Sequence, residues 1–317
     1  MFRVRFVVLI IVLTLFTCYV YIMSSSNVIK TYTPLPTMTT KSTRILRTMM
    51  PREYRKQCIE IMNSPPAKVG PLPWSTLMNA YSNSQDCQEF LLVKQFAHRQ
   101  HIGKGLFIEF GSRDGVHESN TILLEETLGW RGILLEAVPH ERGDIVKNRP
   151  NSIIMAGAVC AKGTAKIHIS KRGGWHGINI DHQRLSDNRG DTISIKCFPL
   201  DEIIKRFGIK RVNYLSVDTE GSEFEALKTF PFDTITADVI GVEILFGTPV
   251  RKKNKEAIIL FLKSKGYYMF EEMPFGDDTS DLFFRPKITG SADDIMYDPK
   301  QFESGKNDCI KSGDCLG

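Results

Sequence analysis

From residue 105 onward, short apolar runs alternate with segments whose apolar residues recur at helical spacing. Runs of this length are typical of buried strands, and the segments between them fit helices that cover a sheet. The predicted strands of this kind are Leu106–Phe110, Gly132–Glu136, Ser152–Ala156, Val212–Asp218 and Val239–Ile244. The predicted helices are Ser119–Leu128, Pro139–Lys147, Leu200–Phe207, Ser222–Thr229 and Asn254–Lys265. Repeated alternation predicts a mostly parallel sheet with helices on both faces.

Four further short strands extend the pattern: Lys166–Ser170, Thr192–Phe198, Tyr267–Phe270 and Leu282–Arg285. The first two enclose a polar loop, Lys171–Asp191, and the last two fit a closing antiparallel pair. The final segment, Pro286–Gly317, is polar and rich in Gly and Asp. We expect it to be loosely ordered apart from a loop closed by cysteines.

The N-terminus carries a different pattern. Arg3 and Arg5 precede Phe6–Met23, eighteen uncharged and mostly apolar residues. A spanning helix needs about 20 such residues and a secretory signal about 7–15, so the run favours a signal anchor. Ser24–Ser26 leave a cleaved signal peptide as the alternative. The basic head favours a cytosolic N-terminus, which would place the rest of the chain in the lumen as a type II membrane protein.

These patterns divide the chain into five parts. They are a cytosolic stub with the anchor (1–23), a Ser/Thr/Pro-rich stem (24–73), a helical lead-in (74–104), an α/β domain (105–288) and a C-terminal tail (289–317). Apolar residues at Leu77, Phe90, Leu91, Val93 and Phe96 predict one or two helices in the lead-in.

The charge of the chain lies mainly in its N-terminal arm. The formal net charge is +5, but residues 1–60 hold nine Lys/Arg against two Asp/Glu, and the remainder hold 32 against 34. The folded part is therefore close to neutral. We see no basic face of the kind that binds nucleic acid.

Seven cysteines fit an oxidising compartment. Cys18 lies in the apolar run, which leaves six that allow 15 different pairings. Pairing of neighbours along the chain would give Cys58–Cys87, Cys160–Cys197 and Cys309–Cys315. No two cysteines have zinc-ligand spacing such as C-x-x-C, so we expect no metal site.

The stretch Leu106–Gly115, LFIEFGSRDG, is the first candidate for chemistry. It reads as a strand, a glycine turn and the approach to a helix, which opens a nucleotide-binding α/β sheet. The glycines permit positive φ and let the backbone approach a ligand. The spacing G-x-x-x-G lacks the middle glycine of the dinucleotide fingerprint, so the turn alone could be a plain connection.

Acids recur in the predicted strands near their carboxyl ends: Glu109, Glu136, Asp218 and Glu243. Ligands of open α/β sheets bind at these ends, and several carboxylates are costly to bury together unless something binds them. Glu136 is placed to accept both hydroxyls of a ribose. Each acid taken alone could instead cap the following helix or turn.

Two further segments offer candidate catalytic groups. Asp218 and Glu220 follow the fourth predicted strand and fit positions in the crevice, as ligand-holding groups or bases, whereas Glu223 fits a helix N-terminus. His176 lies in the glycine-flanked loop GGWHG and could be a general base. The alternative for this loop is a surface turn with Trp175 half-buried.

These residues stand in stretches that together resemble the FkbM-type methyltransferases, which depend on S-adenosylmethionine. The similar stretches are FIEFGSRDGVHESNT, LGWRGILLEAVP, MAGAVC, LSVDTEGSEFEALKTF and VIGVEI, and they span about Leu106 to Arg285. The resemblance implies a Rossmann-like, seven-stranded sheet. It also implies that Glu109, Gly111 and Gly115 form the cofactor loop, that Glu136 binds the ribose and that Asp218 lies beside the methionine moiety and the methyl acceptor.

The resemblance leaves two functions open. One is O-methylation of a small molecule or glycan in the endoplasmic reticulum, Golgi or endosomes, with Asp218, Glu220 or His176 taking the acceptor proton. The other follows the membrane-anchored, Star-like members of the family and is non-catalytic binding of secretory cargo proteins. Arg113 stands inside the glycine turn where family members usually have a small residue, so it bears on cofactor affinity.

Overall fold

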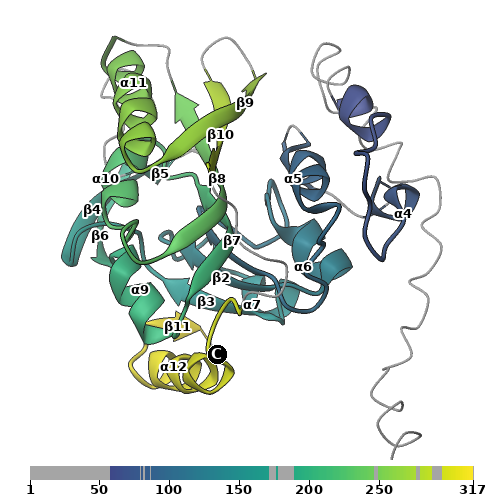
Figure 1. The fold of residues 1–317 in the computed structure, drawn as a ribbon. Coiled ribbons are helices and arrows are strands. Elements are labelled where there is room, and N and C mark those ends of the chain that lie inside the picture. The colour runs from purple at the N-terminus through teal and green to yellow at the C-terminus, as the bar shows by residue number, and fades with distance from the viewer. Residues whose placement is uncertain are drawn as a thin grey trace, which may run out of the picture. The chain divides into compact units, whose positions relative to one another are not determined.

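The main sheet has eight strands in the order β11-β3-β2-β1-β7-β8-β10-β9, drawn as a ribbon in Figure 1. The computed structural model describes residues 58–78, 80, 83–85, 87–170, 176–177, 189–245, 249–275, 279–287 and 295–316. The strands of this sheet are β1 (Leu106–Phe110), β2 (Arg131–Glu136), β3 (Ser152–Ala156), β7 (Arg211–Val217), β8 (Thr236–Leu245), β9 (Tyr267–Phe275), β10 (Thr279–Pro286) and β11 (Cys315–Leu316).

Five neighbouring strands, β3-β2-β1-β7-β8, pair in parallel, and the antiparallel pairs lie at the two sides. The chain moves outward from β1 through β2 to β3 and then returns to the other side of β1 at β7. The carboxyl ends of β1 and β7 therefore flank the point where strand order reverses. Open α/β sheets bind their ligands in the crevice at such a point.

Helices cover both faces of the sheet, as predicted. They are α4 (Trp74–Met78), α5 (Gln88–Phe96), α6 (Ile122–Leu128), α7 (Ile145–Asn148), α9 (Leu200–Arg206), α10 (Glu223–Lys228), α11 (Pro249–Ser264) and α12 (Pro299–Lys311). Alternate residues of one strand serve the two faces, because successive strand side chains point in opposite directions. Phe107 packs in the cluster that contains α5 and α6, whereas Ile108 packs in the cluster that contains α9, α10 and α12.

A second sheet of three strands, β5-β4-β6, branches from the chain after β3. Its strands are β4 (Gly163–Ser170), β5 (His176–Gly177) and β6 (Arg189–Cys197). The disulfide Cys160–Cys197 joins the start of this branch to its end. The two strands predicted here are confirmed with somewhat wider bounds, and most of the loop predicted between them lies outside the described residues.

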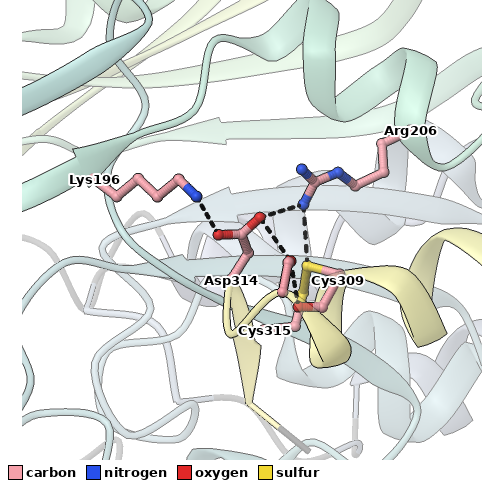
Figure 2. The surroundings of a disulfide bond; sticks show 6 residues. Lys196, Arg206, Cys309, Asp314 and Cys315 are labelled. Carbon is pink, nitrogen blue, oxygen red and sulfur yellow. Dashed lines mark hydrogen bonds and ion pairs between the residues drawn. A yellow bond between two sulfur atoms is a disulfide. The ribbon is translucent and has the colours of Figure 1, made fainter.

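The prediction for the C-terminal tail was wrong. Residues 299–311 form the helix α12, and Cys315 and Leu316 pair with β3 as an eighth strand, where seven were predicted. Figure 2 shows what holds this segment: the Cys309–Cys315 disulfide and the Asp314 carboxylate, which Lys196 and Arg206 approach at 2.5 and 3.0 Å. Burial alone would raise the pKa of Asp314, but hydrogen bonds from Lys196, Ser312 and Arg206 hold it below its ordinary value.

The predicted helix Pro139–Lys147 was too long, because only Ile145–Asn148 is helical. Arg142 instead donates from Nε to the Glu136 carbonyl at 2.9 Å and from Nη2 to the Ala137 carbonyl at 2.7 Å. These bonds fold the connection back onto the end of β2.

The three predicted cysteine pairs are confirmed: Cys58–Cys87, Cys160–Cys197 and Cys309–Cys315. The predicted membrane segment Phe6–Met23 lies outside the described residues. Among the residues that the structure describes, no helix is long and apolar enough to cross a membrane.

Candidate functional site

The turn after β1 brings three strand ends together. Gly111 has φ of +69°, and a Cβ on it would lie 2.8 Å from the Asp218 carbonyl oxygen. Its N–H donates to the Leu135 carbonyl of β2 at 3.1 Å. Glycine is therefore required here both for the backbone conformation and for the close approach of the strand end at Asp218.

Gly115 closes the same turn but faces the interior of the protein. Its φ is +81°, and a Cβ on it would meet Cγ of Arg149 at 2.6 Å. Arg149 is almost fully buried and donates to the Gly115 carbonyl at 3.2 Å, to Ser119 at 3.0 Å and to Thr121 at 2.8 Å. The buried arginine thus supports the turn from below.

Glu109 contributes to this support. Its carboxylate accepts hydrogen bonds from the Asn120 N–H at 2.8 Å and the Thr121 hydroxyl at 2.6 Å, and Arg149 lies 3.5 Å away. Neither Glu109 nor Gly115, both predicted to form the cofactor loop, lines the cavity described below. Both shape the loop from behind it.

Glu136 ends β2 with its carboxylate fixed by the backbone. One oxygen accepts the Arg113 N–H and the other accepts the Val138 N–H, both at 2.7 Å. Burial raises the pKa of Glu136, and the two hydrogen bonds offset this only in part. The carboxylate lines the cavity and retains lone pairs that can accept bonds from a ligand.

Arg113 lies in the turn with φ of +48° and also lines the cavity. Its guanidinium pairs with Glu118 and lies 3.7 Å from Glu141. Burial would lower the pKa of Arg113, but these two acids outweigh it and raise the pKa. The side chain is thereby held at the wall of the cavity between two acids.

The cavity lies at the carboxyl ends of the sheet strands and contains about 1040 Å³ of space, counted out to its open mouth. One wall is apolar, formed by Leu135, Ala137, Val138, Val159 and Ile167. The other end is acidic, formed by Asp218, Glu220, Glu243 and Asp281. The cavity therefore has an apolar part beside Glu136 and a polar part beyond Gly111.

Two carboxyl groups at the acidic end are hydrogen-bonded to each other: Asp218, which follows β7, and Glu243 of β8. Burial raises the pKa of Asp218 to about 7 and that of Glu243 well above its ordinary value. Asp281 of β10 lies opposite Glu243 in the sheet and accepts a hydrogen bond from Gln88 Nε2 at 2.6 Å.

The remaining predicted residues have different places. Glu220 lines the cavity with φ of +54°. Glu223 accepts the Gly221 N–H at 2.7 Å and the Thr219 hydroxyl at 3.1 Å, so it stabilises the turn before α10. His176 lies in β5 of the small sheet, and its side chain is outside the described part of the structure.

The structure adds cavity residues that the sequence analysis did not name as site residues. Asp281 was missed because the predicted strand began one residue later, at Leu282. Gln88 belongs to the lead-in, far from the other site residues in sequence. Glu243 was noted as a strand acid without a role. Among the described residues, no group of three or more His, Cys, Asp or Glu could hold a metal ion.

The order of the parallel strands, the glycine turn after β1 and the acid that ends β2 define the α/β fold of S-adenosylmethionine-dependent methyltransferases. The sequence profile of the methyltransferase FkbM domain matches residues 109–269. This match covers half of the chain, and the chain therefore belongs to the FkbM methyltransferase family.

Several solved structures are similar to this chain. The O-methyltransferase from Bacillus cereus in complex with SAH is 12% identical, covers 78% of this chain and 97% of its own, and has a TM-score of 0.40. Cofactor-bound Rv0187 from MTB gives 10%, 80%, 100% and 0.42. Methyltransferase FkbM from Methylobacillus flagellatus KT gives 11%, 66%, 58% and 0.37. No curated protein sequence matches.

The cavity fits the cofactor of this family, S-adenosylmethionine. Gly111 leaves the space beside the Asp218 backbone that a Cβ would fill. Glu136 presents a fixed carboxylate that can accept the two ribose hydroxyls, and the apolar wall from Leu135 to Ile167 can pack against an adenine ring.

Proposed function

We propose that this protein is an S-adenosylmethionine-dependent O-methyltransferase that acts on a small molecule or glycan. The observation that carries the proposal is Glu136, whose two carboxylate oxygens are each fixed by a backbone N–H at the wall of a ligand-sized cavity. Carboxylates in this position of α/β nucleotide-binding folds accept the hydroxyls of a ribose.

The chain's residues would contribute mainly by holding the two reactants in line. Glu136 and Gly111 would fix the cofactor at one end of the cavity. The acceptor would then lie toward Asp218 and Glu220. When bound, S-adenosylmethionine supplies an electrophilic methyl group, so the protein needs to add orientation and a group that takes the acceptor proton. Asp218, Glu220 and His176 are the proposed candidates for that group.

We place this activity in the lumen of the secretory pathway, on a type II membrane protein. Support comes from three disulfides in the folded part, because such bonds persist in oxidising compartments. The apolar run Phe6–Met23 with Arg3 and Arg5 before it supports the N-terminal anchor.

The alternative is a non-catalytic, cargo-binding member of the family. Arg113 favours it, because a long charged side chain lines the cavity at the turn that would face the cofactor. Its pairing with Glu118 and Glu141 favours the enzyme instead, since the guanidinium is held at the wall.

Calorimetric titration of S-adenosylmethionine into the purified full chain tests the proposal. We expect binding, and we expect Glu136→Ala to weaken it by roughly 10- to 100-fold, because hydrogen bonds to a charged group contribute about 1.5–3 kcal/mol. The control is Glu303→Gln, which changes an exposed acid paired with Arg131 and should leave affinity unchanged. Absence of binding by the wild type at millimolar cofactor would reject the enzyme and favour the cargo-binding protein.

A further inference from the structure

The acidic end of the cavity contains a proton that the sequence does not reveal. The carboxyl groups of Asp218 and Glu243 share a hydrogen bond. Two ionised carboxylates are both acceptors and cannot form such a bond. At least one of the two groups is therefore protonated in this arrangement.

The surroundings keep that proton in place. The charged groups that act on Asp218 and Glu243 from neighbouring elements are all acids, namely Glu109, Glu118, Glu220, Glu223 and Asp281. Each of them disfavours a second negative charge on the pair, and removal from bulk solvent acts in the same direction. The pair thus titrates as one unit, with a first charge that forms readily and a second that forms only at higher pH.

The pair also lies where a methyl acceptor would bind. Both residues line the cavity, and Asp218 touches the turn at Gly111, where its carbonyl oxygen approaches the glycine. Glu136 marks the opposite, nucleoside end. A group bound between Gly111 and β8 would meet the free oxygens of the pair.

We propose that Asp218 and Glu243 form a one-proton carboxyl pair that takes the proton of the acceptor hydroxyl, and that the acceptor is uncharged at the methylated group. This inference rests on the proposed function. During transfer the acceptor oxygen bonds to the methyl carbon, the electron pair of the broken C–S bond stays on the donor sulfur, and the hydroxyl proton passes to the singly charged pair. The pair becomes neutral and later releases that proton to solvent.

The same arrangement selects against carboxylate acceptors. A carboxylate brought to this end of the cavity would meet Glu220 and Asp281 as well as the pair, and like charges repel at short range. It also carries no proton to give up. The base assigned here includes Glu243, a residue outside the candidates named for the proposed function.

Infrared spectroscopy of the full chain tests the proton directly. We expect a protonated-carboxyl band that disappears as the pH rises through about 7. It should be missing from the spectra of Asp218→Asn and Glu243→Gln, two nearly isosteric changes, and present in Glu303→Gln. A wild-type spectrum without a band that titrates in this range would overturn the pair, as would a band that survives in both variants.

Calorimetry separates the acceptor role from a cofactor role. Asp218→Asn and Glu243→Gln should bind S-adenosylmethionine with affinities less than about tenfold from wild type, because the pair serves the acceptor. A larger loss in both variants would assign the pair to the cofactor and overturn the inference. Failure of the wild type itself to bind would reject the proposed function, a result that the infrared band distinguishes because it needs no ligand.

Discussion

At the scale of single residues, Asp218 shows how strongly position determines chemistry. An aspartate at a strand end is ordinary in sequence, but here it is hydrogen-bonded to a second carboxyl and surrounded by acids. Its pKa is consequently raised from 3.8 to about 7, chiefly by burial. The group therefore changes charge near neutral pH, where an ordinary aspartate remains ionised.

This shift predicts a pH dependence of stability. Between about pH 4 and 7 the folded protein binds more protons at Asp218 than the unfolded chain does, so this contribution is present in acid and is lost as the pH rises through about 7. Asp218→Asn should therefore raise the free energy of unfolding at pH 8 relative to pH 4 by on the order of 1–2 kcal/mol. Urea denaturation at both pH values measures this, and equal effects at the two would contradict it.

Residue-level sequence reasoning succeeded where a strand end determined the answer. Glu136, Asp218 and Gly111 line the cavity because consecutive parallel strands end at one edge of the sheet. The reasoning did not extend to Glu109, whose position in the strand directs its carboxylate to the loop instead of the cavity. Side-chain direction at a strand end depends on register, which one sequence does not specify.

At the scale of elements, the turn after β1 depends on a buried cation. Arg149 contacts Glu125 at 2.8 Å and Glu109 at 3.5 Å, and both acids are buried with it. The arginine also donates to the backbone and hydroxyls of the turn. The conformation of residues 111–121 is thus coupled to a residue that follows α7.

Replacing this arginine should be costly. Arg149→Met is expected to lower the free energy of unfolding by about 3–5 kcal/mol, because it leaves Glu125 and Glu109 buried without their cation. The control is Arg131→Gln, which removes an exposed pair with Glu303 and should cost less than about 1 kcal/mol. Chemical denaturation of both variants compares them. Similar losses for the two would show that Arg149 does not support the turn.

Periodic patterns predicted most elements, and they failed where few apolar residues were present. The helix α12 buries only Phe302, Gly305 and Cys309, so its sequence reads as polar. Its start was marked by Asp298, whose side chain accepts from the Lys300 and Gln301 N–H groups. The two-residue strand β11 is too short for any pattern. Its position depends on a disulfide and on Asp314, which are contacts distant in sequence.

At the scale of the whole molecule, the proposal concerns which side of a membrane holds the folded part. Residues 58–316 supply the fold and its cavity, while the predicted anchor precedes them. A lumenal position would explain the use of all six remaining cysteines in disulfides.

Protease protection checks this topology. In microsomes that contain the full chain, we expect the C-terminal part to resist added protease until detergent opens the membrane. Alkaline extraction should leave the protein in the membrane fraction if Phe6–Met23 is an anchor, and release it if the segment is a cleaved signal. Digestion of the C-terminal part in intact microsomes would refute the lumenal assignment.

The three disulfides join each cysteine of the folded part to the next one along the chain, at separations of 29, 37 and 6 residues. During translocation the chain enters the lumen from its N-terminal side, so every cysteine that arrives second finds its own partner as the most recent free thiol. Order of arrival and correct pairing coincide. A chain built in this way can be oxidised while it is still being synthesised, with little need for an isomerase to reshuffle its bonds.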